Sequence, residues 1–285
     1  MDESKRARKL RLSLVRAIPK FPNTKETKDE LEAISLSQLF IHYFNWAYRY
    51  VSIRPREVEI QPTAFKDKRW GRLRGKIDTL LEKVRNGKDL TPHLSLQAHR
   101  RGYTPAAATT GPDTDRWADK DFFLSTMGYH HFHLGERIEN GGFATRTDEV
   151  VFALVAREKF TVVAICDHSV FEFSRSEMNA ERERLWSIFD EHVNRGATPG
   201  TVVISSPIAT SGHPVHLARM AQEYSWVVRE MDPKLEDREF VNSLYVDAGL
   251  EAPKNPKFEW RLNFTDLGIY EKNHALFFVV RRGCN

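Results

Sequence analysis

The sequence of 285 residues predicts an α+β protein, with a small antiparallel sheet core, packed helices and a C-terminal α/β lobe that extends it. Apolar residues recur at helix spacing in two segments of the N-terminal third, at about residues 27–50 and 70–86. Three strand-like runs follow at residues 129–134, 149–155 and 160–166. Helical and strand-like segments then alternate to the C-terminus, and this mixed order is typical of an α+β fold.

The N-terminal third begins with a basic segment, residues 1–24, which we expect to be a flexible tail. A helix is predicted from Thr27 to about Tyr50, and a strand could follow within residues 51–60. Residues 70–86 form a second amphipathic helix, and Asn86-Gly87 supplies its stop signal. Residues 97–116 are rich in Ala, Thr, Gly and Pro, which predicts an exposed loop.

The C-terminal half supplies the rest of the sheet and the second lobe. The short link between the runs 149–155 and 160–166 predicts a hairpin. We expect a core domain at residues 25–175 and a C-terminal lobe at residues 176–285. The lobe's expected elements are a helix at 176–195, a strand at Thr201–Ser205, helices at about 214–231 and 237–248, and strands at 257–263 and 275–281.

The charge is unevenly distributed along the chain. Residues 1–102 hold 23 Lys and Arg against 12 Asp and Glu, a net of +11, whereas residues 103–285 hold 20 against 27, a net of −7. A basic third favours a polyanionic partner, with RNA or DNA phosphate the commonest. A solvated basic face, or an acidic partner such as an inhibitor protein, would fit this charge equally well.

The composition also restricts the compartment. The chain has no apolar run of the roughly 18–20 residues that a membrane span needs, so we expect no membrane partner. Its 2 cysteines, Cys166 and Cys284, argue against a disulfide scaffold and against a cysteine-based zinc site. We therefore expect a cytoplasmic protein.

Histidines gather in the segment Gly128-Tyr129-His130-His131-Phe132-His133-Leu134, and Asp167-His168-Ser169 follows about 34 residues later. Side chains alternate along a strand, so His131 and His133 project from the same face. If the three strand-like runs are sequential antiparallel neighbours, Asp148 and His168 lie beside them, and His93 lies just upstream. Histidine gives and takes protons near neutral pH. This face is therefore a candidate acid–base site.

These residue types meet the needs of RNA cleavage without a metal. That reaction requires a base for the 2′-hydroxyl proton, an acid for the leaving 5′-oxygen, and positive charge for the phosphate. Histidine and carboxylate can supply the first two, and nearby arginines the third. The metal alternative uses His131, His133 and His168 as ligands, because His-x-His is a good ligand pair for zinc, manganese or iron. A structural role in hydrogen bonding on a sheet face is the third interpretation.

Over about residues 70–175 the pattern resembles the RelE/YafQ-like family of bacterial ribonuclease toxins. The matching features are a helix ending in Asn86-Gly87, a Pro92-His93-Leu94 loop, the Tyr129–Leu134 strand, an apolar strand led by Asp148, and a strand ending in Asp167-His168-Ser169. The resemblance implies a catalytic set of His93, His133, Asp148 and His168, to which His131 adds a further member of the same face. It also implies RNA as substrate, with the ribosome and an antitoxin protein as possible partners.

The leading hypothesis is a metal-independent endoribonuclease of toxin type, with no cofactor. His133 or His93 would act as base and His168 as acid, while Asp148 orients a histidine. Cationic side chains would hold the RNA, and the candidates are Arg72, Arg74, Lys76, Arg137, Arg146 and Arg157. The alternatives are a metal-dependent hydrolase or nuclease with a His-x-His site, and a non-enzymatic module that binds nucleic acid or protein.

Overall fold

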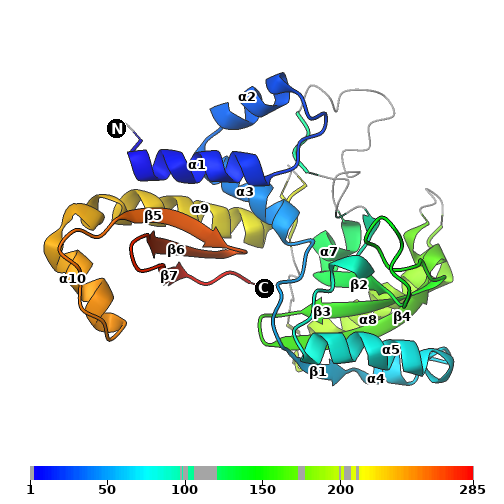
Figure 1. Ribbon diagram of the computed structural model, residues 1–285. Helices are drawn as coiled ribbons and strands as arrows, with labels where there is room; N and C mark the ends of the chain where they lie inside the picture. The colour runs from blue at the N-terminus through cyan, green and yellow to red at the C-terminus, as the bar shows by residue number, and fades with distance from the viewer. Residues whose placement is uncertain are drawn as a thin grey trace. The chain divides into compact units, whose positions relative to one another are not determined.

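The computed structural model describes residues 3–96, 98, 102–105, 121–172, 177–198, 200–201, 207–209 and 212–284. They form an α+β fold of two compact units (Figure 1). Unit 1 draws its described residues from Met1–Tyr48, Arg101–Asp119 and Val215–Cys284, and unit 2 from Arg49–Arg100 and Lys120–Pro214. The loop expected at 97–116 and the strand expected at Thr201–Ser205 lie largely outside the described residues.

Unit 2 is built on a sheet of four strands, β1 (Glu57–Ile60), β2 (Tyr129–His133), β3 (Glu149–Val155) and β4 (Lys159–Asp167). The strand order is β1-β4-β3-β2. The sequential antiparallel pairing of β2, β3 and β4 confirms the expectation from the sequence. β1 is the exception, because it pairs with β4 in parallel. The end of β2, the start of β3 and the end of β4 thus meet at one end of the sheet, called the His133 end below.

Helices cover both faces of this sheet (Figure 1). On one face α5 (Trp70–Arg85) packs its apolar stripe against Phe132, Val151 and Ile165. On the other face α7 (Phe122–Met127) and α8 (Ala180–Asn194) pack against Tyr129, Val150 and Phe152. Short connections complete the unit, namely α4 (Pro62–Phe65), η1 (Thr91–His93) and η3 (His168–Phe171).

The alternation of β2 decides where its histidines lie. His131 is paired with Phe152 and His133 with Val150 across the β2–β3 ladder, so both lie on the α7/α8 face. Phe132 lies on the α5 face. The period of two therefore separates the His131/His133 pair from the basic helix α5.

Unit 1 contains α1 (Lys5–Ala17), α2 (Lys25–Ala33), α3 (Leu36–Ala47), α9 (Val215–Met231), η4 (Pro233–Glu236), α10 (Arg238–Asp247) and the strands β5 (Phe258–Asn263), β6 (Asp266–Glu271) and β7 (Leu276–Arg281). The strands form an antiparallel meander in the order β5-β6-β7. Leu10, Phe40, Tyr224, Trp260 and Ile269 share its core.

The expected flexible tail at residues 1–24 is wrong for its larger part, because Lys5–Ala17 forms the helix α1. Ser4 caps the helix by accepting a hydrogen bond from the backbone N–H of Ala7. Leu10 and Leu14 are fully buried in the core of unit 1. Lys and Arg residues surround these apolar positions, so the spacing of the apolar residues alone does not predict a helix here.

The expected boundaries between domains also differ from those of the structure. Residues 25–48 belong to unit 1, together with most of the expected C-terminal lobe, whereas α8 belongs to unit 2. The single helix expected over residues 27–50 is two helices, because Ser35 starts α3 with a capping box that includes Gln38. Within the described part of the chain, no helix is both long and apolar enough to cross a membrane.

Candidate functional site

Three histidine rings lie next to one another at the His133 end of the sheet, and they are called the histidine row below. The ring centroids of His131 and His133 lie 6.2 Å apart, and those of His133 and His168 lie 5.3 Å apart. His168 begins η3 directly after β4, and its backbone N–H donates to the carbonyl oxygen of Asp148 at 3.0 Å. Three of the predicted residues are therefore neighbours. His168 is exposed, whereas His131 and His133 are buried at 8% and 4% exposure.

His131 lies in an aromatic environment beside a carboxylate. Its ring lies 4.8 Å from that of Phe171 and 5.8 Å from that of Phe152, measured between centroids. Its Nδ1 lies 3.7 Å from Oδ2 of Asp121 and makes no hydrogen bond within the described residues. Burial lowers the pKa of His131, and Asp121 partly opposes that shift. The ring is thus neutral in the folded state, with a carboxylate placed to attract a proton on Nδ1.

His133 is also held neutral. Burial lowers its pKa to about 3, and the positive charge of Arg146 is the next largest cause. Arg146 comes from the loop between β2 and β3, where its Nη1 donates to the carbonyl oxygen of Leu94 at 3.0 Å. Nδ1 of His133 is also buried without a hydrogen-bond partner among the described residues. The site therefore combines an uncharged imidazole with a guanidinium.

His93 is close to this row but is engaged on both ring nitrogens. Its Nδ1 lies 2.9 Å from the carbonyl oxygen of His133, and its Nε2 lies 2.8 Å from Nζ of Lys83. A carbonyl only accepts, so Nδ1 must carry the hydrogen, and Nε2 must accept from Lys83. Burial lowers the pKa of His93, in agreement with this neutral form. His93 therefore ties η1 and α5 to the end of β2.

The predicted carboxylate Asp148 meets the histidines through its backbone. Its carbonyl oxygen accepts the hydrogen bond from His168, and the residue itself is exposed. The carboxylate of Asp121 faces His131, and it also caps α7 by accepting from the backbone N–H of Leu124 at 3.1 Å.

Among the predicted cations, Arg146 lies beside the histidine row, whereas Arg157 lies far from it. Arg157 lies in the hairpin between β3 and β4, at the end of the sheet opposite His133. The seven residues of β3 span roughly 20 Å at about 3.3 Å per residue, so Arg157 lies too far away to contact a phosphate there. Arg137 is exposed on the loop between β2 and β3.

The cations of α5 lie on the other face of the sheet. Arg72, Arg74 and Lys76 are exposed there, but two of them are paired with carboxylates. Arg72 binds Glu149 at the start of β3, and Arg74 lies 3.7 Å from Asp78 on its own helix. The structure therefore does not bring these three cations to the His131/His133 pair.

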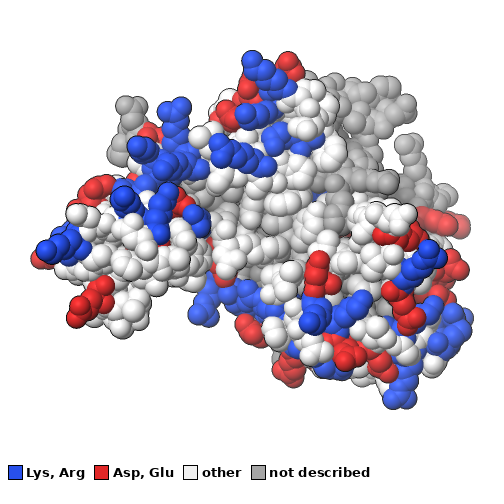
Figure 2. Space-filling model, viewed as in Figure 1, with Lys and Arg blue, Asp and Glu red and all other residues white. Residues whose placement is uncertain are grey.

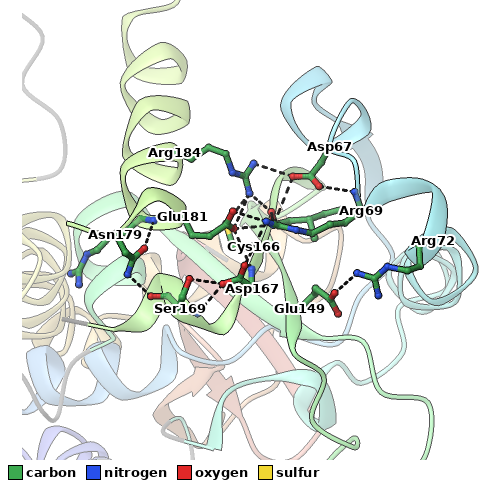
Figure 3. A network of polar contacts seen from close by, with 12 residues as sticks. Asp67, Arg69, Arg72, Glu149, Cys166, Asp167, Ser169, Asn179, Glu181 and Arg184 are labelled. Carbon is green, nitrogen blue, oxygen red and sulfur yellow. Dashed lines mark hydrogen bonds and ion pairs between the residues drawn. The ribbon is translucent and has the colours of Figure 1, made fainter. Parts of the chain in front are cut away.

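A network of partly buried charges supports the His133 end (Figure 3). Arg69, before α5, binds both carboxylate oxygens of Glu181 on α8, at 2.5 and 2.9 Å, and the carbonyl oxygen of Ile165 on β4 at 2.8 Å. Arg184 joins the same Glu181 to Asp67, with nitrogen–oxygen distances of 3.2 and 3.1 Å. These contacts fix the start of α5, the start of α8 and the end of β4 relative to one another.

The network continues into the segment that carries His168. The backbone N–H of Asp167 donates to Glu181 at 3.2 Å, and Oδ1 of Asp167 accepts from the backbone N–H of Ser169 at 3.0 Å. Nδ2 of Asn179 donates to the carbonyl oxygen of Ser169 at 2.5 Å. Hydrogen bonds to Asp167 and Ser169 thus hold η3, the segment that begins with His168 (Figure 3).

The donor geometry does not favour the metal alternative. Across the described ranges, no group of three or more His, Cys, Asp or Glu side chains could hold a metal ion. His133 lies beside both other rings, at centroid distances of 6.2 Å from His131 and 5.3 Å from His168. The rings differ in exposure, since His168 is exposed and the other two are buried, and Arg146 acts on both buried rings.

Sequence reasoning missed Asp121 and the charged network. The local signal for Asp121 was present, since an aspartate before Phe122-Phe123 and three residues before Leu124 is a helix-cap pattern. The network joins residues near positions 67–69, 167 and 181–184, and no local spacing connects these segments. In comparisons with known proteins, no family model, no curated protein and no solved structure matches the chain.

Proposed function

We propose that the chain is a metal-independent endoribonuclease of toxin type, with its active site at the His133 end of the unit 2 sheet. The observation that carries this proposal is the row of His131, His133 and His168 beside the guanidinium of Arg146. The row provides a buried neutral imidazole and an exposed imidazole about one phosphate group apart. Such a pair can remove one proton and deliver another during a single displacement at phosphorus.

In the proposed reaction His133 takes the proton of a 2′-hydroxyl, and the freed 2′-oxygen attacks the adjacent phosphorus. The bond from phosphorus to the 5′-oxygen breaks, and protonated His168 delivers a proton to that leaving oxygen. The products are a 2′,3′-cyclic phosphate and a free 5′-hydroxyl. Proton exchange with water then restores both rings. Arg146 stabilises the additional negative charge on the phosphate in the transition state.

The depressed pKa of His133 changes when a phosphate binds. In the free protein, burial and the charge of Arg146 hold that pKa at about 3. A bound phosphate places negative charge beside Arg146 and offsets its effect, so the affinity of His133 for a proton rises. The base therefore becomes stronger once substrate is present, and it stays unprotonated in the free protein at neutral pH.

The proposal gives the residues next to the row, Asp121 and His93, supporting roles. Asp121 faces Nδ1 of His131, so it favours a proton on that nitrogen. His93 positions β2 through its contact with the carbonyl oxygen of His133. These assignments replace the earlier expectations that His93 acts as a base and that the carboxylate of Asp148 orients a histidine.

The test is cleavage of a fluorescently labelled RNA by purified protein in the presence of EDTA. We expect cleavage that leaves 2′,3′-cyclic phosphate ends and that is lost in the His168→Ala variant. His192→Ala is the matched control, because His192 lies on α8 and is not part of the row. In parallel, cells that express the wild type should stop growing and show fragmented RNA, and cells that express His168→Ala should not.

Two results would contradict the proposal. Cleavage that requires a divalent metal and disappears in EDTA would favour the metal-dependent nuclease. RNA binding without cleavage, unchanged by His168→Ala, would favour a non-enzymatic binding module.

A further inference from the structure

We propose that the exposed cationic side of helix α1 in unit 1 is a binding surface for the RNA backbone. Lys5, Arg8, Lys9 and Arg16 define it, and they are called the α1 cation face below. The choice of RNA as the polyanion rests on the proposed function, but the surface itself rests on a separate part of the molecule.

The sequence of α1 concentrates positive charge without compensation. Its 13 residues include Lys5, Arg6, Arg8, Lys9, Arg11 and Arg16 and contain no Asp or Glu. Positions separated by three, four and eleven residues lie on one side of an α-helix, so the four members of the α1 cation face point the same way. From Lys5 to Arg16 the face extends roughly 16 Å at about 1.5 Å per residue. Figure 2 shows blue side chains gathered over this helix.

The other two cations of α1, Arg6 and Arg11, are paired with neighbouring carboxylates, whereas, among the described residues, the members of the α1 cation face are not. Arg6 binds Asp232 at 2.9 Å and Glu236 at 2.7 Å, and Arg11 binds Glu3 at 3.0 Å. Within the described parts of the chain, the members of the α1 cation face form no ion pair with a carboxylate. Four exposed like charges repel one another, and a polyanion would relieve that repulsion.

The burial of α1 argues against a membrane as the partner. An amphipathic helix binds a lipid surface by inserting its apolar side. In α1 that side is already occupied, because Leu10, Leu14 and Val15 are at most 1% exposed in the core of unit 1. The helix therefore offers charge without apolar surface, which matches the electrostatic part of nucleic-acid binding.

A groove beside the face adds a place for a base or sugar. It measures about 310 Å³ and runs between α1 and β5, with Lys9 and Ser13 on one wall and Arg261 on the other. This volume lies at the lower end of the range for small-ligand pockets, which begins at about 300 Å³. It also contains the carboxylate of Glu259, which is neutralised by Arg261 and Lys272.

The test measures binding of a short labelled single-stranded RNA by fluorescence anisotropy over a series of salt concentrations. All proteins carry His168→Ala, so that cleavage does not interfere. The test variant replaces the four members of the α1 cation face by Gln. The control replaces four exposed cations near the ends of α5 by Gln, namely Lys66, Lys68, Arg85 and Lys88. A circular dichroism melt confirms that each variant is folded.

We expect the dependence of log Kobs on log salt to become shallower by about 3 in the test variant and to stay unchanged in the control, since each lost phosphate contact contributes about 0.7 for a single strand. Equal slopes in the test variant and the parent would overturn the inference. Polyglutamate and anionic phospholipid vesicles serve as competing probes. If either binds with the same dependence on the α1 cation face while RNA does not, the partner is an acidic protein or a membrane, and the assignment to RNA is wrong.

This experiment and the cleavage assay together separate the inference from the proposed function. If the His168→Ala protein binds RNA through the α1 cation face and the protein with His168 intact does not cleave RNA, the surface stands and the endoribonuclease proposal fails. If cleavage depends on His168 while the α1 variant binds RNA normally, the endoribonuclease proposal stands and the α1 cation face fails as a binding surface.

Discussion

Replacing Glu181 by Gln removes one negative charge from the buried network at the His133 end and keeps the size of the side chain. In the wild type, the carboxylate accepts two hydrogen bonds from Arg69, one from Arg184 and one from the backbone N–H of Asp167. Its side chain is only 16% exposed. The variant would leave Arg69 without its bidentate partner in a place where water can hardly compensate.

Two magnitudes give the expected loss in the free energy of unfolding. Burial by itself would raise the pKa of Glu181, but the hydrogen bond from Arg69 and the charge of Arg184 outweigh it and lower that pKa to about 2. A shift of about two and a half units from the ordinary glutamate value corresponds to about 3 kcal/mol. Removing one partner of a fully buried ion pair typically costs about 3–5 kcal/mol, and the lower end of that range applies here because the pair is only partly buried. We therefore expect Glu181→Gln to lower the free energy of unfolding of unit 2 by about 3 kcal/mol at neutral pH.

The same pKa determines how this loss varies with pH. The folded protein holds the carboxylate ionised down to about pH 2, whereas the unfolded chain protonates it near pH 4.5. The stabilising contribution is therefore fully present above about pH 4.5 and is lost as the pH falls toward 2. The difference between wild type and Glu181→Gln should shrink over that interval.

The assay is urea denaturation combined with amide hydrogen exchange of β4, which reports on unit 2 directly. Glu149→Gln is the matched control, because the partner of Glu149, Arg72, is 62% exposed. An exposed partner makes a pair worth less than about 1 kcal/mol. A loss that is the same for both variants, or that stays constant from neutral pH to pH 3, would refute the electrostatic reasoning.

The other predictions concern single positions. Arg146→Gln should raise the pKa of His133 from about 3, because a nearby positive charge is removed. An NMR titration of the His133 ring measures this pKa, and an unchanged value would show that burial alone lowers it. Gly268→Ala should destabilise unit 1 in thermal melts, since a Cβ there would lie 2.6 Å from the backbone oxygen of Phe278; a wild-type melting temperature would contradict this. Cys166 should resist alkylation in the folded protein, because burial raises the pKa of its thiol to about 12; rapid labelling under native conditions would contradict this.

The α+β fold and the central hairpins were predictable because strand and helix periods are local properties. β2, β3 and β4 each have a short apolar or aromatic run with clear boundaries, and they pair with their neighbours in sequence. β1 was harder to place, because its parallel partner β4 comes about 100 residues later in the chain. No local pattern specifies a contact of that separation.

In the candidate site, too, local patterns were predictable and contacts between distant segments were not. The face shared by His131 and His133 follows from the period of two, and the position of His168 follows from the end of the next hairpin. Side-chain partners from other segments do not follow from such rules. The use of both ring nitrogens of His93 depends on Lys83 and on a backbone carbonyl, and its neutral, engaged state could be read only from the structure.

The composition of unit 1 from two distant parts of the chain has a consequence for biosynthesis. Leu10 and Phe40 pack with Tyr224 and Trp260 in one core, so the N-terminal helices obtain part of their core only from the 70 residues Val215–Cys284. At about 5–20 residues per second, the ribosome needs roughly 4–14 s to make that segment. During this time the sheet of unit 2 can already form, while the apolar sides of α1 and α3 still await Tyr224 and Trp260. A nascent chain stalled near residue 214 would therefore expose those helices to chaperones and proteases.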